Sequence, residues 1–136
     1  MADLKGHANS LLEAFNNSDW DGVRGLMGSA TYTEYGTQRQ LSGEDVIEAM
    51  QGWKGAMPDV AGTVNNMVES ADQVIQEVTW SGTHTGPLAT PDGEIPASGK
   101  TQNTPAAMIL EYEGDELKEW RHYFDMLTFL QQIGAA

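Results

Sequence analysis

The chain has 136 residues, enough for one domain over residues 1–136 that buries about two thirds of its unfolded surface. Twenty acidic residues against seven basic ones give a net charge of −13, which argues against partners such as nucleic acid or anionic membrane lipid. The absence of cysteine excludes disulfide scaffolds, thiolate metal sites and cysteine nucleophiles. We also find no apolar run long enough for a membrane span and no apolar secretion signal, so we expect a cytoplasmic protein.

Helical spacing of apolar residues dominates the first half of the chain. It predicts a helix that begins near Leu4 and ends at Phe15, and a second helix over 18–28 with Ser18 as its N-cap. A short strand follows over 30–35. Next comes a helix over 42–57, which begins at a pattern resembling a capping box and ends before a proline. This half therefore reads as three helices and one short strand.

The second half changes to the alternating period of strands. The strands are expected at 60–69, 74–85, 101–112 and 117–125. A long loop over 86–99 is predicted from its three prolines and three glycines, and Pro105 indicates a bulge or an edge position. Residues from Met126 onward are expected to form a short closing helix or tail. Helices followed by meandering strands predict an α+β fold in which helices cover a curved, antiparallel sheet.

The last predicted strand carries large side chains on both of its faces. Arg121, Tyr123 and Asp125 share one face, and Trp120 and His122 share the other. A strand that is apolar on both faces is usually covered on both. We therefore expect the helices to cover one face and a second subunit to cover the other in a homodimer, with His122 at that interface or on the surface.

Asp125 is the first candidate for chemistry because it ends an apolar run. Apolar surroundings would raise the pKa of its carboxyl group toward the range useful for proton transfer. The alternative is that Asp125 is the N-cap of the following segment. Arg121, on the same face, is a candidate ion-pair partner that would instead keep the carboxyl group ionised.

Other candidates lie at the ends of strands. His84 has the parity of Trp80 and would project into the same cavity as a proton donor, or else it bonds to a neighbouring backbone group. Glu34, beside Tyr32, is a candidate general base or an exposed charge at a strand end. Trp53, Trp80 and Trp120 are core residues or the walls of a pocket for a flat ligand.

Motifs for other chemistries are missing from the sequence. We find no phosphate loop, no nucleophile elbow and no dinucleotide fingerprint. The three histidines lack metal-ligand spacing. We therefore expect neither a metal nor a cofactor.

Five segments resemble one known family. They are 15–22 (FNNSDWDG), 42–47 (SGEDVI), 80–88 (WSGTHTGPL), 113–125 (EGDELKEWRHYFD) and 130–134 (LQQIG). Together they are similar to the SnoaL-like polyketide cyclase (ester cyclase) family of the nuclear-transport-factor-2-like (NTF2-like) superfamily. The resemblance implies a cone-shaped α+β barrel, a hydrophobic pocket between helices and sheet, and a dimer.

The resemblance also implies an activity. In the family's cyclases, an Asp near the end of the last strand acts as acid and base in an intramolecular aldol closure without a cofactor. That residue corresponds to Asp125, with His84 as a donor at the pocket mouth.

We therefore expect a small enzyme acting on a hydrophobic, polyketide- or steroid-like molecule. The pocket would be lined by Tyr32, Glu34, Trp53, Trp80, Arg121 and Tyr123. The alternatives are an isomerase similar to ketosteroid isomerase that uses Glu34, and a non-catalytic module for ligand binding or dimerisation.

Overall fold

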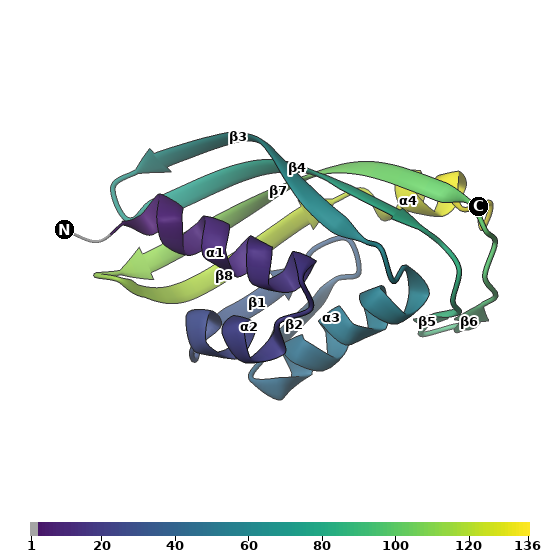
Figure 1. Ribbon diagram of the computed structural model, residues 1–136, viewed down its shortest axis with the longest axis horizontal. Helices are drawn as coiled ribbons and strands as arrows, with labels where there is room; N and C mark the ends of the chain where they lie inside the picture. The colour runs from purple at the N-terminus through teal and green to yellow at the C-terminus, as the bar shows by residue number, and fades with distance from the viewer. Residues whose placement is uncertain (1–2) are drawn as a thin grey trace.

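Helices lie against one face of a curved sheet (Figure 1). The computed structural model describes residues 3–136. The helices are α1 (Leu4–Asn16), α2 (Trp20–Met27), α3 (Glu44–Ala56) and α4 (Met126–Gln132). The strands are β1 (Thr31–Glu34), β2 (Arg39–Ser42), β3 (Ala61–Ser70), β4 (Gln73–Thr83), β5 (Leu88–Thr90), β6 (Gly93–Ile95), β7 (Thr101–Glu113) and β8 (Glu116–Phe124). The predicted α+β class is confirmed.

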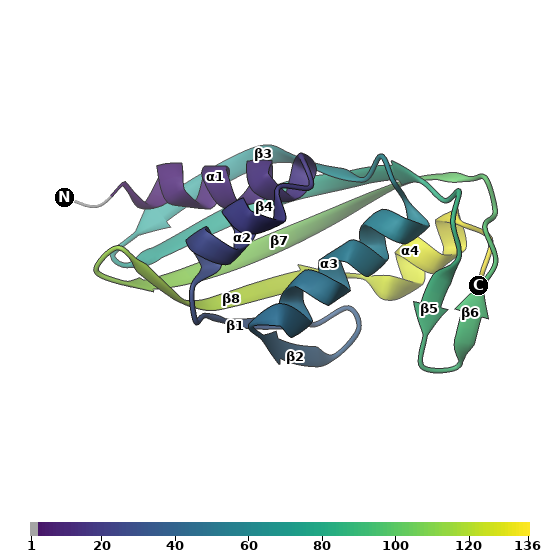
Figure 2. The ribbon, with the colours of Figure 1, turned by 60° about the horizontal axis from the view of Figure 1, so that its bottom comes forward.

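Six strands form the main sheet in the order β2-β1-β8-β7-β4-β3. Neighbouring strands are antiparallel except for β1 and β8, which run parallel. The sheet is therefore curved and mostly antiparallel, as expected, but it stays open with β2 and β3 as its edges rather than closing into a barrel. Strands β5 and β6 form a separate hairpin at the same end of the molecule as α4 (Figure 2).

Several local predictions were wrong. Ser18 has a positive φ of 54°, and the N-cap of α2 is instead Asp19, whose carboxylate accepts from the N–H of Gly22. The residue before α3 is Gly43, which provides no side-chain cap, so the expected capping box is not formed. Strand β2 and the β5–β6 hairpin were not predicted, because short strands carry little periodic signal.

Pro105 lies in β7, a central strand of the sheet, opposite Thr79 of β4. The pairing of β7 with β8 ends one residue away, at Ala106 opposite Phe124. The position is thus a local edge, because β8 does not extend beside it. This explains how a residue without an N–H fits a strand in the middle of the sheet.

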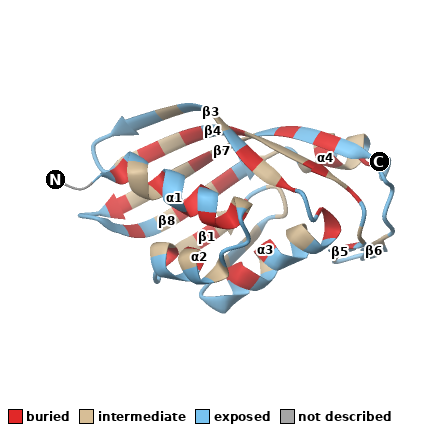
Figure 3. Ribbon diagram, in the orientation of Figure 1, coloured by how far each residue is buried: buried red, intermediate tan, exposed pale blue. Residues whose placement is uncertain are grey.

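Burial alternates along the strands and follows one stripe of each helix (Figure 3). Helix α1 contributes the residues that the helical spacing predicted, among them the buried Leu11 and Phe15. Asn16 fixes the end of this helix to β3, since its side chain accepts from the N–H of Gly62 and donates to the carbonyl of the same residue, at 2.8 and 3.0 Å. The core therefore lies between the helices and the inner face of the sheet.

A bulge determines which side of β8 faces the helices. The register between β7 and β8 shifts at Glu111 and Tyr112, so that Tyr112 pairs with Leu117 and Glu111 with Glu119. The shift turns Leu117 inward, where it is buried, although strict alternation would place it with the outward residues. Beyond the bulge, every second residue of β8 from Trp120 points toward the helices.

None of the helices described between residues 3 and 136 has the length and hydropathy needed to cross a membrane.

Candidate functional site

A cavity lies between the helices and the inner face of the sheet. The space open to the centre of a water molecule is about 70 Å³, well above the ~10–15 Å³ that one water needs. Its wall is mostly apolar and strongly aromatic. The aromatic side chains other than Tyr32 and His122 are Phe15, Trp53, Trp80, Trp120, Phe124 and Phe129. Such a lining with few polar groups is typical of sites for small hydrophobic ligands.

A chain of hydrogen bonds crosses the wall of this cavity. Nε1 of Trp80 donates to Nε2 of His122 at 2.9 Å, and Nδ1 of His122 lies 2.9 Å from the hydroxyl of Tyr32. That hydroxyl donates to Oε2 of Glu34 at 2.8 Å. His122 is 7% exposed, Tyr32 4% and Glu34 1%. Three strands, β4, β8 and β1, thus bring these side chains together.

The partners fix the tautomer of His122. An indole nitrogen can only donate, so Nε2 of His122 must accept, and a neutral imidazole then carries its proton on Nδ1. The Nδ1–H donates to the oxygen of Tyr32, which in turn gives its own proton to the bond with Glu34. All donors in the chain therefore point toward the carboxylate.

Glu34 is the ionised end of the chain. Its Oε2 accepts from Tyr32 and also from Nε1 of Trp53 at 3.2 Å. Its Oε1 accepts from the hydroxyl of Thr37 at 2.7 Å and from Arg39, both of whose contacting nitrogens lie at 3.0 Å. Both oxygens of the carboxylate therefore accept hydrogen bonds from the protein.

The pKa values follow from burial and from this charge. Burial would raise the pKa of Glu34, but the hydroxyl of Thr37 and the charge of Arg39 outweigh it and lower the pKa. Burial lowers the pKa of His122 to about 4, although the charge of Glu34 opposes the shift. Burial, followed by the charge of Glu34, raises the pKa of Tyr32 well above its ordinary value. Near neutral pH the chain consists of an ionised Glu34, a neutral Tyr32 and a neutral His122.

A second polar cluster lies on β7. The hydroxyl of Thr104 donates to Oε1 of Gln102 at 2.6 Å, and the amide of Gln132 reaches that hydroxyl at 3.2 Å. Among residues 3–136, the acceptor for the amide N–H of Gln102 is the sulfur of Met57, at 3.5 Å. Gln102 and Thr104 both line the cavity. Sequence reasoning missed them, although their alternation with the inward Met108 was a usable signal.

Two buried side-chain nitrogens have no hydrogen-bond partner within residues 3–136. One is Nε1 of Trp120, in the cavity wall, and the other is Nε2 of His84. A buried N–H without an acceptor costs about 1–3 kcal/mol.

Asp125 does not have the surroundings that the sequence indicated. Its side chain is exposed and is not part of the cavity lining. It is the N-cap of α4, accepting from the N–H of Leu127 at 3.1 Å and from the hydroxyl of Thr128 at 2.7 Å. The hydroxyl of Thr128 is the main reason that the pKa of Asp125 is lowered rather than raised. The predicted desolvation of this carboxylate is therefore wrong, and the cap reading is right.

His84 is fully buried but lies outside the cavity lining. Its Nδ1 accepts from the N–H of Ser98 at 3.2 Å and lies 3.0 Å from the hydroxyl of the same residue. Its backbone N–H donates to the carbonyl of Lys100 at 2.9 Å, which is a hydrogen bond to the segment that follows β6. The expected position at a pocket mouth is therefore wrong, and His84 fastens the end of β4 to residues 98–100.

Arg121 and Tyr123 lie on the outer face of β8 and do not line the cavity. Arg121 pairs with Glu111 of β7 at 2.9 Å instead of with Asp125. Tyr123 is 39% exposed and stacks on Tyr35, with ring centroids 4.4 Å apart. The expected roles of Arg121 and Tyr123 in the pocket are wrong because odd-numbered residues of this part of β8 face outward.

His122 is the residue that sequence reasoning placed on the wrong side. It was expected at an interface or on the surface, yet it lines the cavity together with the predicted Tyr32, Glu34, Trp53 and Trp80. Alternation had correctly separated it from Asp125. The pattern could not tell which of the two faces turns toward the helices, because both carry large side chains.

The comparisons with known proteins agree with this fold. The family model described as SnoaL-like polyketide cyclase matches residues 6–133. The chain belongs to this SnoaL-like family. No curated protein sequence matches it.

Solved structures of several other proteins have the same fold at low identity. IdmH from Streptomyces antibioticus is 22% identical with a TM-score of 0.83, over 97% of this chain and 99% of its own. TsrD from Streptomyces laurentii is 22% identical with a TM-score of 0.80, over 97% and 95%. A protein with a ketosteroid isomerase-like fold from Catenulispora acidiphila is 19% identical with a TM-score of 0.76, over 96% and 93%. The expected NTF2-like fold of this SnoaL-like chain is thus confirmed.

The SnoaL-like domain shows no cluster of three His, Asp or Glu suited to a metal ion among its described residues.

Proposed function

We propose that the chain binds a small hydrophobic, polyketide- or steroid-like molecule in its cavity and moves a proton on it by acid–base chemistry without a cofactor, with His122 as the group that accepts the proton. The observation that carries the proposal is the hydrogen-bonded order His122, Tyr32, Glu34 along the cavity wall. A buried imidazole backed by a carboxylate can take up a proton, because the negative charge stabilises the imidazolium that forms.

The proposed step begins on a carbon next to a carbonyl group of the ligand. Nε2 of His122 takes the proton from that carbon, and the C–H electron pair becomes the enolate. The Nδ1–H of the imidazolium keeps its hydrogen bond to the oxygen of Tyr32. Because the Tyr32 hydroxyl donates to Glu34, the negative charge of the carboxylate stabilises the imidazolium through this hydroxyl. The proton then returns to another carbon in an isomerisation, or to the new alkoxide after an aldol ring closure.

The step requires that Trp80 release Nε2, since its indole N–H donates to that nitrogen in this structure. Catalytic hydrogen bonds often form only in the complex with the ligand. Glu34 acts in this scheme through Tyr32 and not as the direct base of the isomerase alternative, because donors from the protein occupy both of its oxygens.

Replacement of His122 by Gln tests the proposal. The assay follows exchange of the protons next to the carbonyl group of 1-indanone in D₂O by NMR. The wild-type protein is expected to accelerate the exchange, and His122→Gln is expected to reduce that acceleration by about 100-fold, the lower end of what a general base contributes. Binding of 1-indanone, measured separately by titration, should change little, because the apolar wall remains.

Asp125→Asn is the matched control. Asp125 is exposed outside the cavity lining, so this variant should exchange 1-indanone at the wild-type rate. Exchange by His122→Gln at the wild-type rate would reject His122 as the base. A large loss in Asp125→Asn would restore the assignment made from the sequence.

A non-catalytic ligand-binding module is the second candidate. The observation in its favour is that Trp80 donates to Nε2 of His122 while donors from the protein engage both oxygens of Glu34, so neither His122 nor Glu34 is a free base in this structure. The same assay separates the two functions. A wild-type protein that binds 1-indanone without accelerating its exchange would be such a module.

The proposal includes a homodimer formed through the outer face of the sheet. Helices α1 to α3 lie on the inner face (Figures 1 and 2). Apolar side chains remain exposed on the outer one. Tyr35 is 44% exposed, Tyr123 39% and Val68 45%. The partly buried Ile75 and Ile109, which pair across β4 and β7, face the same side. Exposed apolar patches of this kind mark interaction surfaces.

A charge on this face should separate the subunits. Tyr123→Glu is expected to shift the sedimentation coefficient from that of a dimer to that of a monomer, because it would place two like charges in a desolvated interface. Leu127→Glu, which changes an apolar residue of α4 that is 55% exposed, is the control and should remain dimeric. A wild-type chain that sediments as a monomer would refute this part of the proposal.

A further inference from the structure

Three indole rings line the cavity, and they differ in what their N–H groups contact. Nε1 of Trp80 donates to His122, and Nε1 of Trp53 donates to Glu34. Nε1 of Trp120 has no acceptor in the described chain, although the residue is only 4% exposed. An unpaired buried donor is costly, and natural proteins rarely keep one without a use for it.

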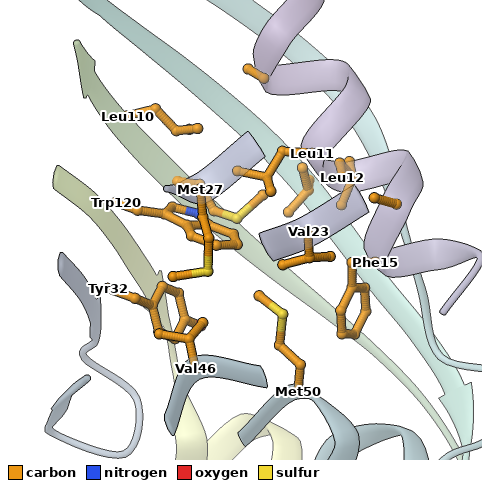
Figure 4. Close-up of a cluster of buried hydrophobic side chains, with 14 of the residues drawn as sticks. Leu11, Leu12, Phe15, Val23, Met27, Tyr32, Val46, Met50, Leu110 and Trp120 are labelled. Carbon is orange, nitrogen blue, oxygen red and sulfur yellow. The ribbon is translucent and has the colours of Figure 1, made fainter. Parts of the chain in front are cut away.

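The position of Trp120 makes it suited to contact a ligand. It lies on β8 between Leu110 of β7 and Tyr32 of β1, in register with both. Figure 4 shows Trp120 together with Tyr32 and Met27 in the cluster of buried apolar side chains. The ring centroid of Tyr32 lies 4.8 Å from that of Trp120. Neighbours on both sides therefore hold the indole in place, so it is a fixed donor.

Trp120 and His122 project from the same face of one strand, two residues apart. Their backbones are therefore about 6–7 Å apart along β8. Both residues line the cavity, so a ligand that occupies it lies against both side chains. A ketone oxygen accepts hydrogen bonds, so the unpaired N–H of Trp120 is the kind of group that would recognise it.

We infer that Trp120 is a ligand-binding residue whose indole N–H donates to a carbonyl oxygen, and that the cavity therefore selects hydrophobic ketones over hydrocarbons of the same shape. The inference rests on the proposed binding function of the cavity, but it does not require that the protein be an enzyme. The donor replaces a hydrogen bond that the carbonyl loses on leaving water, and the apolar wall supplies the rest of the affinity.

A matched pair of probes tests the inference. 1-Indanone carries a carbonyl group, and indane has the same ring system without it. Replacement of Trp120 by Phe keeps an aromatic ring and removes the N–H. We expect the variant to bind 1-indanone about three- to tenfold more weakly than the wild type, the range of one neutral hydrogen bond, while its affinity for indane changes by less than about twofold.

The wild-type protein provides a second readout that does not depend on how the variant folds. The chain has four Trp, so a ¹⁵N-labelled sample gives four indole N–H signals, and the one lost in Trp120→Phe belongs to Trp120. That signal should move downfield when 1-indanone is added and should not do so with indane. Trp20→Phe is the control for loss of an indole outside the cavity lining, and it should leave the downfield shift of Trp120 intact.

The outcomes separate this inference from the proposed function. If both probes shift the backbone amide signals of the cavity while the indole signal of Trp120 moves no further with the ketone than with the hydrocarbon, the donor role is overturned and hydrophobic binding stands. If neither probe shifts those amides, both are overturned. A downfield shift without accelerated proton exchange supports the donor role and rejects catalysis on this ketone.

Discussion

Replacing Glu34 by Ala is expected to lower the free energy of unfolding by about 2–4 kcal/mol, because a buried donor left without an acceptor costs about 1–3 kcal/mol. The buried hydroxyl of Tyr32 would lose its acceptor, and so would the N–H of the partly exposed Trp53. Arg39 would lose its ion pair, but it is partly exposed and regains water. Denaturant unfolding followed by circular dichroism measures the change.

Glu111→Ala is the matched control on the outer face of the same sheet. Glu111 also pairs with an arginine, Arg121, at 2.9 Å, but its side chain is 37% exposed. Exposed ion pairs contribute about 0–1 kcal/mol. Equal losses in the two variants would show that Glu34 is no more than another surface ion pair.

Acidification from pH 6.5 to pH 4 is expected to reduce the free energy of unfolding by about 3 kcal/mol through His122 alone. The pKa of His122 falls from an ordinary 6.5 to about 4 because the ring is buried. Between these two values the unfolded chain binds a proton at this residue and the folded chain does not. Protonation therefore favours the unfolded state in this window, and stability rises with pH until the unfolded histidine is neutral.

The variant His122→Gln should lack this dependence between pH 4 and pH 6.5. Glu34 has the opposite charge type and a lowered pKa in the folded chain. Its contribution is present above the ordinary pKa of a carboxyl group and is lost as the pH falls through the lowered value, so it adds little above pH 4.5. A wild-type protein and a His122→Gln variant with the same pH profile would contradict the buried, neutral state of His122.

The cavity and the polar chain on its wall connect these expectations. Tyr32 and His122 are 90 positions apart in the chain, yet they meet because β1 runs parallel to β8 with Glu34 opposite His122 in the register. Removing one of the three polar residues changes the partners of the others. Their effects on stability and on proton exchange should therefore be coupled rather than additive.

Local patterns in the sequence determined much of the fold. Periodicity and turn residues, which act over a few positions, predicted three features of the fold. These are the apolar stripe of α1, the long strands of the second half and the turn between β7 and β8. The preference of Asp for N-caps is equally local, and it accounts for the observed role of Asp125. Tyr32, Glu34, Trp53 and Trp80, which were predicted for the pocket, line the cavity, and their binding of a ligand stays a prediction.

Only the tertiary structure decided which face of β8 lines the cavity. Alternation divides the strand into one set with Trp120 and His122 and another with Arg121 and Tyr123, but large side chains occur in both sets. The choice depends on the bulge, whose extra residue Lys118 separates the inward Leu117 from the inward Trp120, and on the helices that pack on one side; strict alternation along β8 predicts neither. For the same reason Arg121 finds its partner across the sheet rather than along its own strand, since cross-strand neighbours are set by register and not by nearness in sequence.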